Sequence, residues 1–359
     1  MRFDLIRPED LSEGDAGTWR DLAALHADTR SPFLGPDWVR AVSACAGPDA
    51  ARARVLVIRD GEDAVGFMGV RVGRFSSISA GAPFCDYQGL VLRPDVGVTA
   101  RQVVDALNTD RLDLSCVVAS DRTFADHLRV RDASMVIDLS EGYDAYQKER
   151  RAAGTDILQD AAKKMRKLFR EHGEARFTPL SASQDDLATL IGWKRARYGE
   201  TRQTDVLEPA WSQALMQTVF GQRDAQFGAP LFTLHAGDQL IAAHLALRAG
   251  PRLHAWIIAH DDRFARYSPG LLLIAEIIRW AASQGCDEFD LGPGDYGFKV
   301  RLANRHRAIG HGFVGRPSAP TWLRAAAYGV RETAEALPLG RFSELPGKAM
   351  RRLDLIRSL

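Results

Sequence analysis

The sequence predicts an α/β (α+β) protein of two tandem domains, each a mixed, mainly antiparallel sheet flanked by helices. The chain has 359 residues, 46% of them hydrophobic, which is enough for two ordinary cores. The same series of patterns occurs in each half: helices, a hairpin, then strand–helix–strand. A basic helix that ends at His172-Gly173 separates the two series. We expect an N-terminal domain over 1–155, a C-terminal domain over 156–316 and an amphipathic tail over 317–359.

Hydrophobic periodicity and turn residues place the individual elements. A hairpin is expected at Asp60-Gly61-Glu62-Asp63, where turn residues join two strand-like runs. The elements expected in the first half are helices at 18–28, 37–45 and 99–107, and strands at 53–59, 64–72, 86–92, 112–119 and 133–139. Those expected in the second half are helices at 156–172, 184–199, 208–220 and 269–284, and strands at 175–180, 230–235, 240–248, 252–259 and 286–291.

The charge balance narrows the classes of function. The formal net charge is +1 with 26% charged residues, which argues against DNA binding by bulk electrostatics. The four cysteines lie too far apart for a metal knuckle or a CxxC pair, so no metal is expected. The N-terminus lacks the apolar core of a signal peptide, and no apolar run is long enough to span a membrane. We therefore expect a cytoplasmic protein.

The segment 252–294 carries the clearest chemical pattern: a strand, a loop, a helix and a second strand. The helix begins at Ser268-Pro269-Gly270, with proline in its first turn. The dipole and free N–H groups of a helix start bind anions, and Arg263 and Arg266 lie close by in sequence. A ligand whose diphosphate capped this helix would send its reactive arm between the two strand ends. The same spacing also fits an ordinary βαβ crossover.

Three segments resemble the GNAT acetyltransferase superfamily, and within it the FemAB-like branch of the CelD/BcsL type, which is named for cellulose and exopolysaccharide biosynthesis. They are SPFLGPDWVRAV (31–42), KKMRKLFREHGEARFTPL (163–180) and DEFDLGPGDYGFKVRLANRHR (287–307). The resemblance implies tandem GNAT folds. It also implies an N-acyltransferase, with acetyl-CoA as donor and an amine on a sugar or cell-envelope precursor as acceptor.

The helix start departs from the family pattern Q/R-x-x-G-x-G/A. The chain has Arg266-Tyr267-Ser268-Pro269-Gly270-Leu271, which keeps an arginine and one glycine and lacks the second glycine. The resemblance implies that these residues, with Arg263, bind acetyl-CoA. Relatives that use aminoacyl-tRNA keep the fold, so that donor stays open.

Acyl transfer needs a deprotonated amine and a polarised carbonyl. Lys299 matches the lysine that follows an aromatic residue in the third segment, and could stabilise an oxyanion or stand on the surface. Asp290 could act as the base or hydrogen-bond to the backbone at its strand end. His260 ends its strand beside the donor loop, a position suited to a base. His244 and His254 lie within apolar strands and are interpreted as core residues.

The acceptor side is expected to draw on both halves. The resemblance implies a catalytic acidic residue at Asp86. The substrate-binding residues expected are Tyr87, Lys163, Arg166, Asp295 and Tyr296. The basic helix either contacts a phosphorylated acceptor, such as a sugar nucleotide or lipid-linked sugar diphosphate, or forms a solvated face.

The tail mixes apolar residues with cations. It can lie on an anionic membrane surface, as a peripheral contact at the inner face, or pack back onto the domain. Arg129–Asp132 and Arg351–Asp354 each spell RxxD, a short pattern used by some cyclic dinucleotide sites. A second hypothesis, which the incomplete glycine loop keeps open, is a non-catalytic member that senses a nucleotide or recruits partners at the membrane through the tail.

Overall fold

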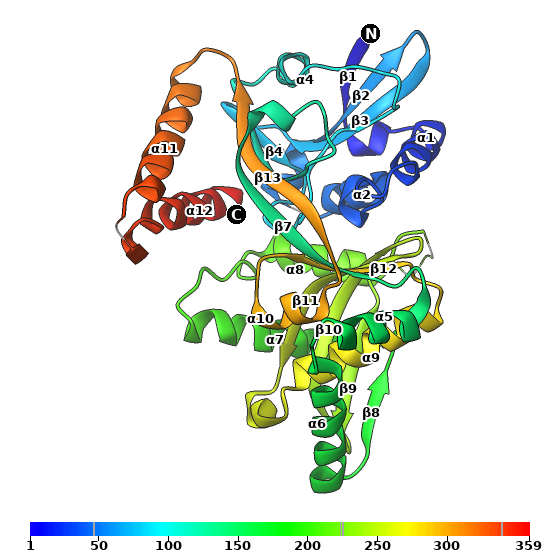
Figure 1. Cartoon of the computed structure of the whole chain (residues 1–359). Coiled ribbons are helices and arrows are strands. Elements are labelled where there is room, and N and C mark those ends of the chain that lie inside the picture. The colour runs from blue at the N-terminus through cyan, green and yellow to red at the C-terminus, as the bar shows by residue number, and fades with distance from the viewer. Residues whose placement is uncertain (46, 223, 225, 339) are drawn as a thin grey trace. The chain divides into compact units, whose positions relative to one another are not determined.

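A computed structural model describes the whole chain except residues 46, 223, 225 and 339 (Figure 1). The chain forms two compact units. Unit 1 comprises Met1–Asp132 and Ala308–Leu359, and unit 2 comprises Ala133–Arg307. These limits differ from the expected boundaries after residues 155 and 316.

Unit 1 is built on a mixed sheet with strand order β1-β2-β3-β4-β6-β13, in which only β4 and β6 run parallel. Its strands are β1 (Arg2–Ile6), β2 (Ala53–Asp60), β3 (Asp63–Arg71), β4 (Ser76–Ser79), β5 (Val91–Leu92), β6 (Arg111–Val118) and β13 (Arg305–Gly315). Its helices are α1 (Glu13–Ala24), α2 (Pro36–Ser43), α3 (Pro48–Arg52), α4 (Ala100–Ala106), α11 (Ala319–Ala336) and α12 (Leu345–Ser358).

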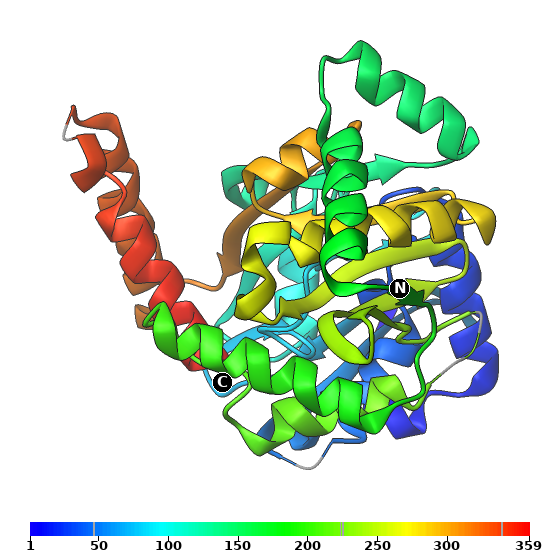
Figure 2. The same ribbon diagram turned by 90° about the horizontal axis from the view of Figure 1, so that it is seen from below.

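Unit 2 is built on a sheet with strand order β7-β12-β11-β10-β9-β8, in which only β11 and β12 run parallel. Its strands are β7 (Leu128–Asp138), β8 (Ala175–Thr178), β9 (Leu231–Ala236), β10 (Gln239–Ala249), β11 (Arg252–His260) and β12 (Glu288–Pro293). Its helices are α5 (Gly142–Ala152), α6 (Ile157–His172), α7 (Gln184–Glu200), α8 (Ala210–Phe220), α9 (Pro269–Ser283) and α10 (Gly297–Leu302). Figure 2 shows α6 and α9 on one face of this sheet and α7 on the other.

The two sheets share one plan, which confirms the predicted fold class. In each, antiparallel strands lead to one parallel pair, joined through α4 in unit 1 and α9 in unit 2. The final strand of each sheet is exchanged: β7 follows β6 in sequence but pairs with β12, and β13 follows β12 but pairs with β6. This exchange moves residues 133–155 into unit 2 and returns the chain to unit 1 after Arg307.

Most of the expected elements are present, including both hairpins and the basic helix with its Gly173 cap at φ 82°. The expected strand 86–92 is reduced to β5 and an isolated bridge at Gln88. The elements that the sequence did not predict include β1, α3, β4, α5, α10 and β13. Strand β13 escapes the usual pattern because it starts with charged residues and contains three glycines.

Close packing explains one of those glycines and gives a stability prediction. A Cβ on Gly312 would lie 2.0 Å from the carbonyl oxygen of His127, so Gly312→Ala should destabilise unit 1 by about 1–3 kcal/mol. Gly17 in α1 has open space around it, and Gly17→Ala should stabilise by about 0.5–1 kcal/mol. Urea unfolding measures both. Similar effects from the two substitutions would contradict this packing.

The tail forms two long helices, α11 and α12, which lie side by side (Figure 1). Arg324, 8% exposed, donates to both carboxylate oxygens of Asp354 at 2.7 and 2.9 Å and lies 3.1 Å from Asp113 on β6. Tyr328 stacks on Phe313 with ring centroids 5.5 Å apart. The tail therefore packs within unit 1, which is one of its two predicted behaviours.

Membrane contact by the other face of the tail stays a prediction. Large apolar side chains of α11 and α12 remain exposed, namely Trp322, Leu323, Val330, Leu345, Leu353 and Ile356. Over the described residues, no helix has the length and apolar character needed to cross a bilayer.

Candidate functional site

Helix α9 starts as predicted, with Pro269 as its first residue. Ser268 before it adopts the left-handed conformation, at φ 56° and ψ 56°, near where the family pattern has a glycine. The carbonyl of Ser268 accepts from the N–H groups of Leu271 and Leu272. Among the described residues the N–H of Gly270 has no acceptor, so it is the first-turn donor left for a ligand.

One face of α6 lies against this helix start. Lys164 donates to the Ser268 hydroxyl at 2.7 Å, and Lys167 lies 6.0 Å from the centroid of the Tyr267 ring. Glu171 accepts from the Tyr267 hydroxyl and pairs with Arg266 at 3.1 Å. These α6 residues are three or four positions apart, so they share a face.

The two basic residues predicted to bind substrate on α6 lie off that face. Lys163 has 66% of its side chain exposed and pairs with Asp160, and Arg166 is exposed. The basic helix was therefore found, but the residues beside the donor turn are Lys164 and Lys167, which sequence reasoning missed by one position.

Arg263 holds the loop before α9. Its guanidinium pairs with the buried carboxylate of Asp261 at 2.6 Å, and its N–H donates to the same group at 2.9 Å. The bond from Arg263 lowers the pKa of Asp261, against the effect of burial. Tyr267 is buried against His172, and Leu271 packs against the core. Of the predicted donor residues, Arg263, Arg266, Ser268 and Gly270 remain at the surface, although Arg263 is paired with Asp261.

Strands β11 and β12 separate where α9 begins. They pair only from Arg252 to His254 with Glu288 to Asp290, although β11 continues to His260. A Cβ on Gly270 would lie 3.8 Å from Nδ1 of His260, so the open end of β11 adjoins the helix start. An opening of this kind leaves strand-edge N–H and C=O groups that can bind an extended ligand containing amides.

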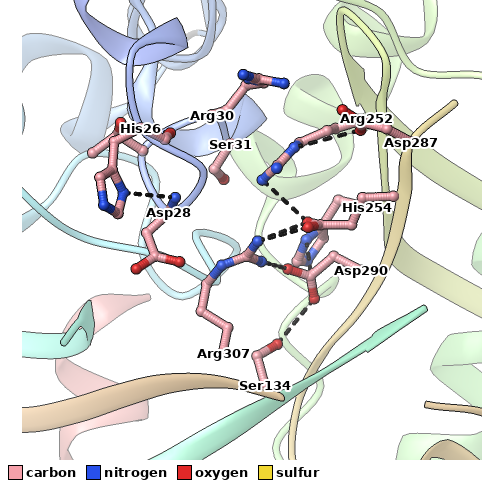
Figure 3. A network of polar contacts seen from close by, with 12 residues as sticks. His26, Asp28, Arg30, Ser31, Ser134, Arg252, His254, Asp287, Asp290 and Arg307 are labelled. Atoms are coloured by element: carbon pink, nitrogen blue, oxygen red, sulfur yellow. Dashed lines mark hydrogen bonds and ion pairs between the residues drawn. The ribbon is translucent and has the colours of Figure 1, made fainter. Parts of the chain in front are cut away.

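Asp290 lies at the point where the strands part, and is 3% exposed (Figure 3). One carboxylate oxygen accepts from the Ser134 hydroxyl at 2.9 Å and from the N–H of Gly292 at 2.8 Å. The other oxygen pairs with Arg307. Because both oxygens are engaged, these contacts suit a group that fixes the end of β12.

Arg307 also binds both oxygens of Glu288, at 2.8 and 2.9 Å, and Arg252 lies 3.3 Å from the same carboxylate. Burial raises the pKa of Glu288, and the two guanidinium groups oppose that effect. His254 lies 3.8 Å from Asp290 and is buried within this network (Figure 3). Sequence reasoning missed Arg252 and Arg307, although Arg307 ends the third family segment.

Lys299 contacts the end of β12, and a second lysine, Lys194, feels its charge. Lys299 on α10 donates to the carbonyls of Pro293 and Gly292 at 2.9 and 3.4 Å and lies 5.4 Å from the Tyr296 ring centroid. Lys194 on α7 is half-buried; burial lowers its pKa, and the charge of Lys299 lowers it further. Sequence reasoning missed Lys194. The one feature of the sequence that could have indicated it is Tyr198, an aromatic residue four positions later on the same helix.

His244 lies in the sheet beside this pair, and is 1% exposed. Burial lowers its pKa to about 3, and the charges of His254, Lys194 and Lys299 act in the same direction. Neither ring nitrogen has a hydrogen-bond partner within the described part of the chain. A buried imidazole is usually bonded, so His244 has capacity for a ligand or water. The prediction that His244 is a core residue agrees with its burial but does not account for its two ring nitrogens without partners.

The remaining predicted residues belong to both units. His260 is partly exposed and 3.7 Å from Asp262, and burial lowers its pKa. Asp295 and Tyr296 are exposed on the loop before α10. Asp86, half-buried, and Tyr87, fully buried, belong to unit 1, and their predicted roles on the acceptor side stay predictions. Among the described residues, no three His, Cys, Asp or Glu side chains are grouped to hold a metal ion.

Comparison with known proteins shows what the second unit is similar to. Residues 155–300 match the model of the acetyltransferase (GNAT) domain. This segment lies within unit 2 and includes α9.

Solved structures share a similar fold over most of the chain. The C-terminal domain (DUF2156) of a "Putative Lysylphosphatidylglycerol Synthetase" from Agrobacterium fabrum has TM-score 0.53 and 14% identity, over 88% of this chain and 96% of that one. A conserved protein of unknown function from Bacteroides thetaiotaomicron has TM-score 0.50 and 10% identity, over 84% and 98%. A tandem GNAT protein of the clavulanic acid pathway has TM-score 0.49 and 13% identity, over 88% and 100%. No curated protein sequence matches the chain.

Proposed function

We propose that unit 2 is an N-acyltransferase that moves an acyl group from acetyl-CoA to an amine on a sugar or cell-envelope precursor, as in exopolysaccharide biosynthesis. The observation that carries this proposal is the parting of β11 from β12 beside the start of α9. One end of the opening offers an anion site, and Lys299 contacts the end of β12.

The donor's diphosphate is assigned to the start of α9. The N–H of Gly270, the helix dipole and the cations Lys164 and Arg266 supply positive potential there. The amide-containing arm then lies along the open edge of β11, where strand groups can hydrogen-bond it. A glycine in this turn would supply a residue that adopts the left-handed backbone conformation readily. Ser268 adopts that conformation here, so the turn forms without the second glycine.

Lys194 is assigned as the general base. Its lowered pKa increases the neutral fraction that can take a proton from the attacking amine. The amine nitrogen bonds to the thioester carbonyl carbon and loses its proton to Lys194. The C–S bond then breaks and the leaving thiolate takes up that proton. Lys299 and Asp290 are assigned as positioning residues, since they hold the loop and the strand end beside the reaction.

Two alternatives to this function are an aminoacyl-tRNA-dependent transferase and a non-catalytic binding protein. An aminoacyl-tRNA donor would need a basic surface for RNA, and the net charge of +1 disfavours it. A non-catalytic member would bind a ligand without turnover. A cytoplasmic location, with or without contact at the inner membrane face, is part of the proposal.

Donor binding can be tested by calorimetric titration of acetyl-CoA into the whole chain. Lys164→Glu should weaken binding roughly 10- to 100-fold, because it removes a cation beside the diphosphate and adds an anion. Lys163→Glu, the matched control on the solvent face, should change the affinity by less than about threefold. Equal losses in the two variants, or no binding to the wild type, would overturn the donor assignment.

The pH profile tests the base. The rate should rise with pH as Lys194 loses its proton. Lys299→Gln removes a neighbouring positive charge, which raises the pKa of Lys194, so the acid limb of the profile should move to higher pH. Thiol release from acetyl-CoA with a panel of amino sugars measures this. Lys163→Gln should leave the midpoint in place, and an unmoved midpoint in Lys299→Gln would contradict the assignment.

A further inference from the structure

Unit 1 contains a cavity that the proposed acyl transfer does not use. Its volume is about 650 Å³, within the range of small-molecule sites. The turn between β3 and β4, the strand β6 and the tail helices α11 and α12 line it. All of its lining residues belong to unit 1, so it is separate from the donor turn of unit 2.

Part of the cavity wall is fixed by ion pairs. Arginines of the wall bind carboxylates in three places: Arg111 with Asp113 at 2.9 Å, Arg324 with Asp354 at 2.7 Å and Arg331 with Glu335 at 2.7 Å. Arg71 donates to the carbonyl of Ser358 at 2.8 Å and so holds the end of α12. These contacts make the wall rigid, and their charges are largely balanced.

A second set of arginines leaves the cavity with a positive surplus. Arg52, Arg74, Arg351 and Arg357 line it, and within the described residues none of them has a carboxylate at ion-pair distance. Their side chains are exposed to the space they line. A guanidinium group binds phosphate through paired N–H donors, so four such groups around one cavity favour a phosphorylated anion.

An aromatic side chain, Phe75, lines the same cavity. Phe75 is 52% exposed, although it is a large apolar residue, and the guanidinium of Arg74 lies 5.0 Å from its ring centroid. An exposed ring beside cations is the arrangement on which nucleic-acid bases stack. A flat anionic membrane would not fill a concave site of this kind.

We propose that this cavity is a nucleotide-binding site, with the phosphates on Arg52, Arg74 and Arg357, the base stacked on Phe75, and Arg351 at the edge of the base. Arg351 and Asp354 lie one turn apart on α12 and both line the cavity. The Asp354 carboxylate is bound by Arg324, so Arg351 is the member of this turn that is available to the base. A guanidinium can donate to the O6 and N7 atoms of guanine, whereas adenine presents an amino donor beside N7. Arg351 therefore favours guanine over adenine. Asp132, from the other RxxD segment, also lines the cavity.

The test is calorimetric titration of the full chain with GMP, cyclic diguanylate, AMP and inorganic phosphate. A guanine nucleotide should bind more tightly than AMP or phosphate. Arg351→Glu should weaken that binding roughly 10- to 100-fold, because it reverses a phosphate- or base-binding charge. Arg352→Glu, its neighbour outside the cavity, should change it less than about threefold. Circular dichroism checks that each variant is folded.

The outcomes separate this site from the donor site. Retained GMP binding in Lys164→Glu, together with loss in Arg351→Glu, supports a nucleotide site in unit 1. Binding of phosphate as tight as that of GMP would overturn the nucleotide assignment. No guanine nucleotide binding, or equal loss in Arg352→Glu, would overturn the site itself. A CoA site confined to the cavity would instead appear as loss of acetyl-CoA binding in Arg351→Glu, against both assignments.

Discussion

Replacing Lys194 by methionine is expected to lower kcat for acyl transfer by about 10²- to 10⁴-fold, the usual contribution of a general base. The substitution keeps the length of the side chain and removes the amine whose pKa burial and Lys299 lower. Affinity for acetyl-CoA should change by less than about threefold, since Lys194 lies on α7 and not at the start of α9. Thiol release and calorimetry measure the two quantities separately.

The neighbouring residue provides the control for that experiment. Arg195 is on the same helix turn, is exposed and pairs with Asp205 at 2.8 Å. Arg195→Met should retain most of the wild-type kcat. If Lys194→Met also retains more than about half of the wild-type kcat, as an ordinary surface substitution would, Lys194 is not the general base.

Arg307→Met is expected to destabilise unit 2 by about 3–5 kcal/mol, because it leaves the buried carboxylates of Glu288 and Asp290 without their main cation. Burial already raises the pKa of Glu288, and losing Arg307 raises it further. Above that pKa the charged carboxylate opposes folding; below it the group is neutral. The loss in the free energy of unfolding of Arg307→Met, relative to the wild type, should therefore be largest at neutral pH and decrease as the pH falls.

Arg305 tests whether this effect depends on burial. It lies two residues earlier on β13, is mostly exposed and pairs with Glu149 at 2.9 Å. Arg305→Met should lower the free energy of unfolding by less than about 1 kcal/mol, because exposed ion pairs contribute no more than that to stability. Urea unfolding at two pH values compares the variants. Equal deficits in both, or a deficit for Arg307→Met that grows on acidification, would contradict the buried network.

Periodicity and turn chemistry predicted most of the fold because those signals are local. The hairpin at Asp60–Asp63 and the proline start of α9 depend on nearby residues only. The exchanged strands β7 and β13 depend on partners far away in sequence, so the boundary after residue 155 could not be read from local pattern.

The sequence predicted the elements around the candidate site, whereas the role of the site itself stays a prediction. Helix α9 starts at Pro269 and the basic helix is α6, but the rotation that brings Lys164 rather than Lys163 to the turn is set by tertiary packing. Lys194 acquires its chemistry only from burial and the charge of Lys299. The contacts of Asp290 likewise come from β7, β12 and β13, which meet only in the fold.

Hydrogen exchange of the full chain with and without acetyl-CoA locates the donor site. A donor bound at the start of α9 should slow exchange across residues 255–272, which include the open edge of β11 and the N–H of Gly270, and leave exchange in α12 (Leu345–Ser358) unchanged. Saturable acetyl-CoA binding that left 255–272 unprotected would contradict a donor site at the start of α9.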